Sequence, residues 1–170
     1  MDLAHSYFLW LMPQREMYDA FQRIIQDLSK TYGTCVFEPH VTLVTGLSGD
    51  EDVLVKKIDA FARGKHKFSV AAKGIDYTHG FLTALFLKIQ NTPAIDQLNM
   101  QAREHLAPFG QGPYHPHLSL LYGDITSQEK EHIIAGFNLV LQTITFNKLK
   151  LIKGHSDVTQ WQGIGEWDLG

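Results

Sequence analysis

Three things are scarce in this chain of 170 residues: cysteine, basic charge and long apolar runs. Cys35 is the only cysteine, so no disulfide bond can form within the chain. The 15 lysines and arginines are outnumbered by 18 acidic residues, and a net charge of −3 offers no basic footprint for duplex nucleic acid. The longest apolar run near the N-terminus, Tyr7–Met12, is too short for a signal peptide or a membrane span. We expect a cytoplasmic monomer that binds neither membranes nor duplex nucleic acid.

The rest of the composition is that of a globular domain, with 44% hydrophobic and 19% charged residues. Apolar periodicity predicts helices at 15–32, 50–62, 92–106 and 127–135. It predicts strands at 4–11, 41–45, 67–75, 81–89, 117–122, 139–153 and 158–168, and an irregular loop at 107–113. Gly33 is suited to end a helix, Asp50 to begin one, and Thr126 with Glu129 to form a capping box. Lys148, Lys150 and Lys153 are expected to form a solvated strand face.

One stretch occurs twice. Residues 37–46 read Phe-Glu-Pro-His-Val-Thr-Leu-Val-Thr-Gly, and residues 114–123 read Tyr-His-Pro-His-Leu-Ser-Leu-Leu-Tyr-Gly. An offset of 77 carries His40 onto His117 and Thr42 onto Ser119. Because residues i and i+2 of a strand share a face, each copy presents an imidazole and a hydroxyl on the same side.

The same offset relates the two halves of the chain. About residues 1–77 and 78–154 each read strand, helix, His-bearing strand, helix, strand, and a strand at 158–168 has no counterpart. We therefore predict a single domain over residues 1–170, built from two repeats whose His-bearing strands face each other across one cleft.

Two imidazoles that face one substrate can act as general base and general acid, because histidine titrates near neutral pH. A phosphodiester suits this pair, since one imidazole activates the nucleophile and the other protonates the leaving oxygen. The hydroxyls of Thr42 and Ser119 can donate to the non-bridging phosphate oxygens. The scheme requires neither a metal nor any other cofactor.

The paired His-x-Thr and His-x-Ser motifs resemble those of the 2H phosphoesterase superfamily. Trp10 shortly before a proline, Phe-x-Pro-His-Val-Thr and Pro-Tyr-x-Pro-His-Leu-Ser-Leu-Leu-Tyr are most similar to its small cyclic nucleotide phosphodiesterases. The resemblance implies an α+β, bilobed fold in which two antiparallel sheets face a central cleft and helices cover the outer faces. It also implies metal-independent hydrolysis of ADP-ribose 1″,2″-cyclic phosphate and of nucleoside 2′,3′-cyclic phosphates, the latter to 2′-phosphates. The expected partner is thus a small cyclic phosphate nucleotide.

Site residues follow from the resemblance by position. It makes His40 and His117 the catalytic pair, has Thr42 and Ser119 bind phosphate, and places Tyr122 and Trp10 in the substrate pocket. We expect His117 to activate water and His40 to protonate the departing sugar oxygen, but the near-symmetry of the motifs leaves the reverse assignment open.

Two departures from the family pattern bear on the substrate and on regulation. Tyr122 stands where RNA-processing relatives often have arginine, which favours small cyclic phosphates. The loop at 107–113 lacks the cysteines of plant members, so redox control of that loop is not expected.

Alternatives stay open at this point. The same chemistry would serve an RNA-end 2′,3′-cyclic phosphodiesterase or ligase, and the same scaffold could be a non-catalytic nucleotide-binding module. The histidines of the two motifs could also be ordinary core residues, although their repetition with matched hydroxyls argues against this. His115 and His117 could offer two imidazoles to a metal, but no Asp, Glu or Cys at matching spacing completes a site. We expect no metal.

Overall fold

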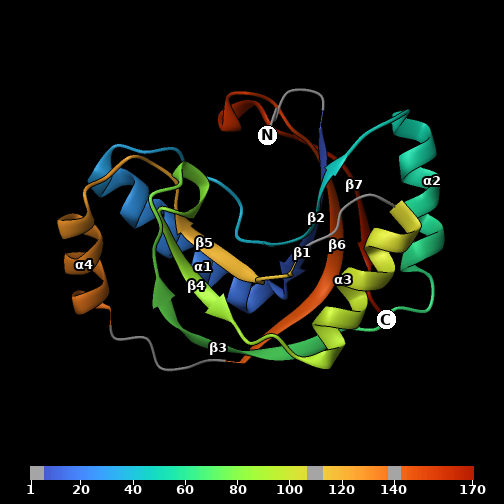
Figure 1. Cartoon of the computed structure of the whole chain (residues 1–170), viewed down its shortest axis with the longest axis horizontal. Helices are drawn as coiled ribbons and strands as arrows, with labels where there is room; N and C mark the ends of the chain where they lie inside the picture. Colours follow the sequence, from blue (N-terminus) through green and yellow to red (C-terminus); the bar gives the residue numbers. More distant parts are fainter. Residues whose placement is uncertain (1–5, 107–112, 138–142) are drawn as a thin grey trace.

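The computed structural model describes residues 6–106, 113–137 and 143–170. The predicted loop at 107–113 and the start of the predicted strand at 139–153 lie largely outside these residues, as do positions 4 and 5. In chain order the elements are β1 (Tyr7–Pro13), α1 (Arg15–Tyr32), β2 (Val41–Leu47), α2 (Glu51–Ala62), β3 (Phe68–Asp76), β4 (Leu85–Ile89), α3 (Pro93–Leu106), β5 (His117–Leu121), α4 (Ser127–Gly136), β6 (Thr143–Lys153) and β7 (Gln162–Asp168) (Figure 1). The predicted order of elements in the two halves is the order observed.

The helix ends are where local sequence signals predicted them. Gly33 follows α1 in the left-handed conformation with φ of 65°, which a residue without a Cβ adopts at little cost. The Asp50 carboxylate accepts a hydrogen bond from the Val53 amide at the start of α2. Thr126 and Glu129 form the complete capping box of α4.

Two predicted strands are shorter than expected. Phe81–Thr83 forms a 3-10 turn ahead of β4, because the Thr83 amide bonds back to the Gly80 carbonyl at 3.1 Å. Val158–Gln160 forms a second such turn ahead of β7. There the Asp157 carboxylate accepts from the Thr159 amide and holds the chain in a bend.

All the strand pairs are antiparallel, and their order is β1-β2-β5-β4-β3-β6-β7. Because β1 also pairs with β6, the strands β1, β2, β5, β4, β3 and β6 close into a barrel, and β7 lies on β6 outside this circuit. The two separate sheets implied by the resemblance are therefore joined. The junctions are the β3–β6 pairing and one register pair between β2 and β5, Val41 with Leu118.

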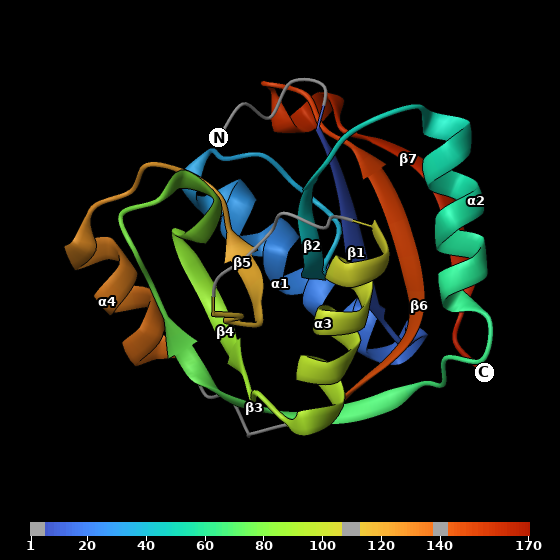
Figure 2. The same cartoon turned by 45° about the vertical axis from the view of Figure 1, so that its right-hand side comes forward.

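The helices lie around this barrel. Helices α2 and α3 pack together on one side, α4 lies on the opposite side, and α1 contacts β5 and β1 (Figures 1 and 2). One continuous apolar core draws on both halves of the chain, with Leu9, Val41, Leu87, Leu118 and Leu151 fully buried. None of the described helices combines the length and the apolar composition that crossing a bilayer requires.

Strand alternation gives β1 a second buried face. Leu9 and Leu11 enter the main core, whereas Phe8, Trp10 and Met12 point the other way and pack with Ile152 of β6. Tyr18 and Trp161 cover this second cluster. The face of β1 that carries Trp10 is also the face on which the candidate site is built.

Candidate active site

The two motifs meet where β2 pairs with β5. Val41 with Leu118 is the single register pair of these two strands. Extending this antiparallel register by one residue in each direction places Thr42 opposite His117, and His40, which directly precedes β2, opposite Ser119. These four side chains share the face that Val41 and Leu118 do not occupy. Directly opposed Cβ atoms lie about 4.5–5.5 Å apart, and His40 and His117 are diagonal neighbours at roughly 7 Å. The fold thus brings together four of the predicted site residues, the two imidazoles and the two hydroxyls.

Both imidazoles are held in the same way. Nδ1 of His40 lies 2.7 Å from the Glu38 carbonyl oxygen, and Nδ1 of His117 lies 2.9 Å from the His115 carbonyl oxygen. A carbonyl oxygen only accepts, so Nδ1 carries the hydrogen in each ring and Nε2 is left to exchange protons. The proline between each histidine and its acceptor fixes φ, which explains why both Pro-His pairs give the same local geometry.

His40 lies in an apolar and nearly closed environment. Its ring stacks on Trp10 with centroids 3.5 Å apart and an interplanar angle of 9°, and Phe37 packs edge-on against it. Only 5% of the residue is exposed. Burial lowers the pKa of His40 to about 3, against the opposing effect of the Glu38 carbonyl, and positive charge on His117 and Lys150 adds to the decrease. The free protein therefore holds His40 neutral at physiological pH.

An aromatic residue of each motif reaches across to the other motif. Phe37, from the first, stacks on Tyr122 of the second with centroids 3.6 Å apart. Tyr114, from the second, donates its hydroxyl hydrogen to the Thr42 carbonyl at 3.1 Å. The only sequence signal for this exchange was that Phe37 and Tyr114 occupy equivalent positions in the repeat. These crossed contacts fix the two motifs relative to each other.

The remaining predicted positions are more enclosed than a substrate-stacking role suggests. Trp10 is 4% exposed and His40 occupies one of its faces; Tyr122 is 3% exposed and stacked on Phe37. Burial raises the pKa of Tyr122 well above its usual value. The Ser119 hydroxyl donates to the Leu82 carbonyl at 2.8 Å, so it must turn away from that acceptor to donate to a phosphate.

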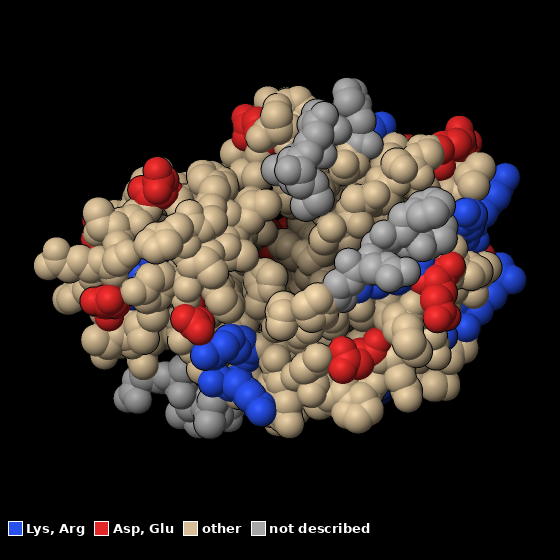
Figure 3. Space-filling model, viewed as in Figure 1, with Lys and Arg blue, Asp and Glu red and all other residues tan. Residues whose placement is uncertain are grey.

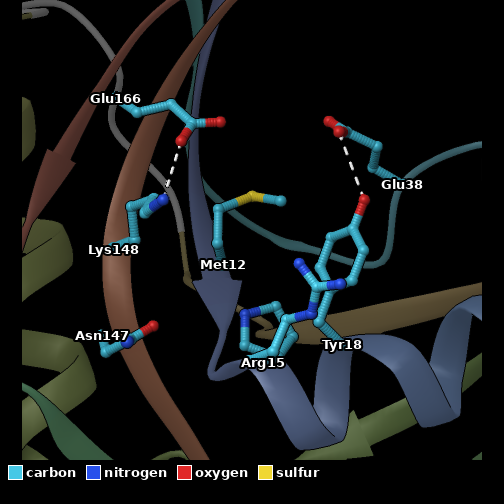
Figure 4. Close-up of a pocket in the computed structure, with 8 residues that line it drawn as sticks. Met12, Arg15, Tyr18, Glu38, Asn147, Lys148 and Glu166 are labelled. Atoms are coloured by element: carbon cyan, nitrogen blue, oxygen red, sulfur yellow. Dashed lines mark hydrogen bonds and ion pairs between the residues drawn. The ribbon is translucent and has the colours of Figure 1, made fainter.

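Sequence reasoning missed an ion-pair network beside His40. Lys150, expected on a solvated face, is opposite Trp10 in the β1–β6 ladder, and its side chain is only 13% exposed. It contacts both carboxylate oxygens of Glu38 at 2.7 and 2.9 Å and lies 3.2 Å from Glu166. The Tyr18 hydroxyl also donates to Glu38, while Lys148 donates to Glu166 (Figure 4). Glu38 thus has two roles. Its backbone carbonyl orients His40, and its carboxylate accepts hydrogen bonds from Tyr18 and Lys150.

The family follows from a direct comparison. Residues 5–169 match the model of the family described as cyclic phosphodiesterase-like protein. The chain belongs to this family. The resemblance to the 2H phosphoesterase superfamily drawn from the paired motifs is thereby confirmed.

One curated protein and several solved structures are similar to this chain. A cyclic phosphodiesterase of Arabidopsis thaliana is 26% identical over 126 residues, which are 74% of this chain and 70% of that protein. LigT of E. coli has the same fold, with a TM-score of 0.65 at 15% identity over 97% of each chain. A protein of Thermus thermophilus gives a TM-score of 0.62 at 14% identity over 96% of this chain and 97% of that one. Other LigT structures hold 3′-AMP, ATP or NADP+.

One cavity borders the second motif, and another borders Glu38 of the first motif. A cavity of about 570 Å³ has His117 on its wall, and a second of about 320 Å³ lies between Met12, Tyr18 and Glu38 (Figure 4). The surface is visibly hollowed near the centre of the face in Figure 3. Within the described part of the chain, no three His, Cys, Asp or Glu side chains gather as metal ligands would. Both cavities are within the size range of small-molecule sites.

Proposed function

We propose that this phosphodiesterase hydrolyses small cyclic phosphate nucleotides, namely ADP-ribose 1″,2″-cyclic phosphate, nucleoside 2′,3′-cyclic phosphates, or both, the nucleosides being released as 2′-phosphates. The supporting observation is the pairing of Val41 with Leu118, which makes His40 and His117 diagonal neighbours on one face. Each ring keeps Nε2 free because a backbone carbonyl occupies Nδ1. Family membership supports the same activity, and the nucleotides held by LigT are of the proposed substrate size.

The sequence-based mechanism makes His117 the base. Its Nε2 takes a proton from water as the oxygen attacks phosphorus in line with the 3′ oxygen. His40 gives a proton to that 3′ oxygen as its bond to phosphorus breaks, and Thr42 and Ser119 donate to the non-bridging oxygens. Proton exchange between the imidazoles and water then resets the pair.

The burial of His40 favours the reverse order. With a pKa of about 3, His40 of the free protein is in the unprotonated form that a general base requires and not in the protonated form that a general acid requires. His40 can act as the acid if the negative charge of a bound phosphate raises its pKa, since a nearby opposite charge favours the protonated form. The two assignments differ in which histidine the leaving group needs.

The pair itself is tested by single replacements. His40→Ala and His117→Ala should each lower turnover of a 2′,3′-cyclic nucleotide by roughly 10²–10⁴-fold, the range typical of a lost general acid or base. His132→Ala is the matched control, since His132 is exposed on α4. Phosphorus NMR of the products from a panel of cyclic phosphates, with and without a chelator, identifies the bond cleaved and the preferred substrate. Near-normal turnover in either site variant would contradict the paired mechanism.

The direction of proton transfer is tested with sulfur as the leaving atom. A 2′,3′-cyclic phosphate with bridging sulfur at the 3′ position releases a thiolate, which leaves without a proton. The variant that lacks the acid should therefore recover most of its activity on this substrate, while the variant that lacks the base stays slow. Recovery by His40→Ala would support the sequence-based order, and recovery by His117→Ala the order that burial favours. Recovery by neither variant would refute this division of roles.

A further inference from the structure

The cavity beside His117 differs in chemistry from the site it adjoins. The strands β3 and β4 and the segment before β5 form its walls, so it opens on the side of His117 away from Trp10 and His40. Aromatic and apolar groups from Phe86, Tyr114 and Pro116 make up part of the lining, and Lys73 and Lys88 supply positive charge. Its volume of about 570 Å³ is ample for one nucleotide fragment.

Lys88 is the cation of this cavity that the strand register places beside His117. In the β4–β5 ladder Lys88 is directly opposite His117, and Phe86 is directly opposite Ser119. Directly opposed side chains share a face, with Cβ atoms about 4.5–5.5 Å apart. Phe86 confirms this placement, since its ring packs edge-on against His117 with centroids 5.2 Å apart. A lysine thus extends from the same face of the barrel as the imidazole that adjoins the reacting phosphate.

In the free protein Lys88 forms an ion pair with Asp76 that an anionic ligand could replace. Its ammonium lies 3.0 Å from the Asp76 carboxylate, and the two side chains are 49% and 47% exposed. A half-exposed pair of this kind contributes little to stability, because water competes for both charges. An anionic ligand in the cavity can therefore take over Lys88 at small cost.

We propose that this cavity binds a second phosphate group of the substrate, and that Lys88 exchanges Asp76 for it. The inference deepens the proposed function and rests on it: the cavity is the place for the second phosphate of a substrate such as ADP-ribose 1″,2″-cyclic phosphate, and Lys88 favours such substrates over simple nucleoside 2′,3′-cyclic phosphates. The cavity near Met12 suits this group less well, because Glu38 and Glu166 balance its two cations, Arg15 and Lys148. Among the described residues that line the cavity beside His117, Asp76 is the single carboxylate, against the two cations Lys73 and Lys88. A net charge of −3 favours a small ligand over a long RNA strand.

A matched pair of substrates tests the proposal. Adenosine 2′,3′-cyclic phosphate and its 5′-phosphorylated form differ only in the second phosphate. Lys88→Gln should lower kcat/KM for the 5′-phosphorylated substrate about tenfold more than for the other, the size expected for one lost charge-assisted hydrogen bond. Lys88→Arg should retain most of the preference, and Asp76→Asn should increase it by freeing the lysine. Lys57→Gln, on the exposed face of α2, is the charge-matched control.

Four other outcomes of this experiment would each contradict a proposal or change the substrate that it names. An equal loss on both substrates would overturn the proposal by placing Lys88 at the reacting phosphate, and no loss on either would overturn it as well. Stronger turnover of an oligonucleotide with a cyclic end, with the same dependence on Lys88, would replace the small nucleotide by RNA. If the wild type turned over neither substrate, the proposed function would fail. The cavity would then be tested by calorimetry, where Lys88→Gln should weaken adenosine 2′,5′-bisphosphate about tenfold more than adenosine 2′-phosphate.

Discussion

Acid should destabilise this protein through His40. Burial against Trp10 lowers the pKa of His40 to about 3 in the folded protein, whereas the same imidazole titrates near 6.5 in an unfolded chain. As the pH falls below 6.5, the unfolded chain binds a proton that the folded protein does not accept until about pH 3. The contribution of His40 to stability is therefore complete above pH 6.5 and is lost progressively between 6.5 and 3.

The structure sets the size of this effect. Each pH unit well inside this window costs about 1.4 kcal/mol, so lowering the pH from 7.5 to 4.5 should remove about 2.7 kcal/mol from the free energy of unfolding. That is a large share of the roughly 5–15 kcal/mol that stabilises a typical domain. Because the residue is 5% exposed, solvent screening does little to reduce it.

The loss of stability on acidification is measured by denaturant unfolding of the wild type and of His40→Asn at pH 7.5 and 4.5. Asparagine keeps an amide donor for the Glu38 carbonyl but does not titrate, and carboxylates common to both proteins cancel in the difference. The stability advantage of the wild type over the variant should shrink by about 2–3 kcal/mol on acidification. His132→Asn, at an exposed position, should follow the wild type. If the stability difference between the wild type and His40→Asn is the same at both pH values, the prediction is wrong, because His40 then titrates alike in the folded and unfolded states.

Two further predictions concern the neighbours of the site. Lys150→Met removes a positive charge that lowers the pKa of His40, so histidine NMR should show that pKa higher than in the wild type but still below 6.5; an unchanged or lower value would contradict this. Gly123→Ala should cost about 1–3 kcal/mol in thermal unfolding, because φ is +149° and a Cβ would lie 2.7 Å from Thr34 Cγ2. Gly136→Ala, where a Cβ meets nothing within 4 Å, should be neutral or slightly stabilising, and a similar cost at both positions would contradict the steric explanation.

Much of the fold could be predicted from the sequence because its signals are local. A helix cap depends on residues a few positions apart, and so Gly33, Asp50 and Thr126 marked helix ends correctly. Strand alternation put His40 with Thr42 and His117 with Ser119 on single faces. The repeat at an offset of 77 further indicated that the two faces belong together.

The predictions that differed from the structure depended on distant parts of the chain. Two separate sheets were expected, but β3 pairs with β6 and β2 with β5, which joins the strands into one barrel through residues more than seventy positions apart. Lys150 looked solvated because its strand alternates charge with apolar residues, and its ion pair with Glu38 spans 112 positions. Hydrophobic periodicity says which face of a strand is buried, but not which strand lies beside it.

The two His-x-Thr/Ser strands, and the membership of the 2H phosphoesterases that they indicate, could be predicted because each motif is a run of contiguous residues. The difference between the two histidines, by contrast, arises only in the folded chain. His40 stacks on Trp10 and is shielded from water, whereas His117 adjoins an open cavity and is opposite Lys88 in the β4–β5 ladder. The physical reason is that desolvation and charge neighbours depend on what the closed barrel brings around each ring, and two nearly identical motifs do not contain that information.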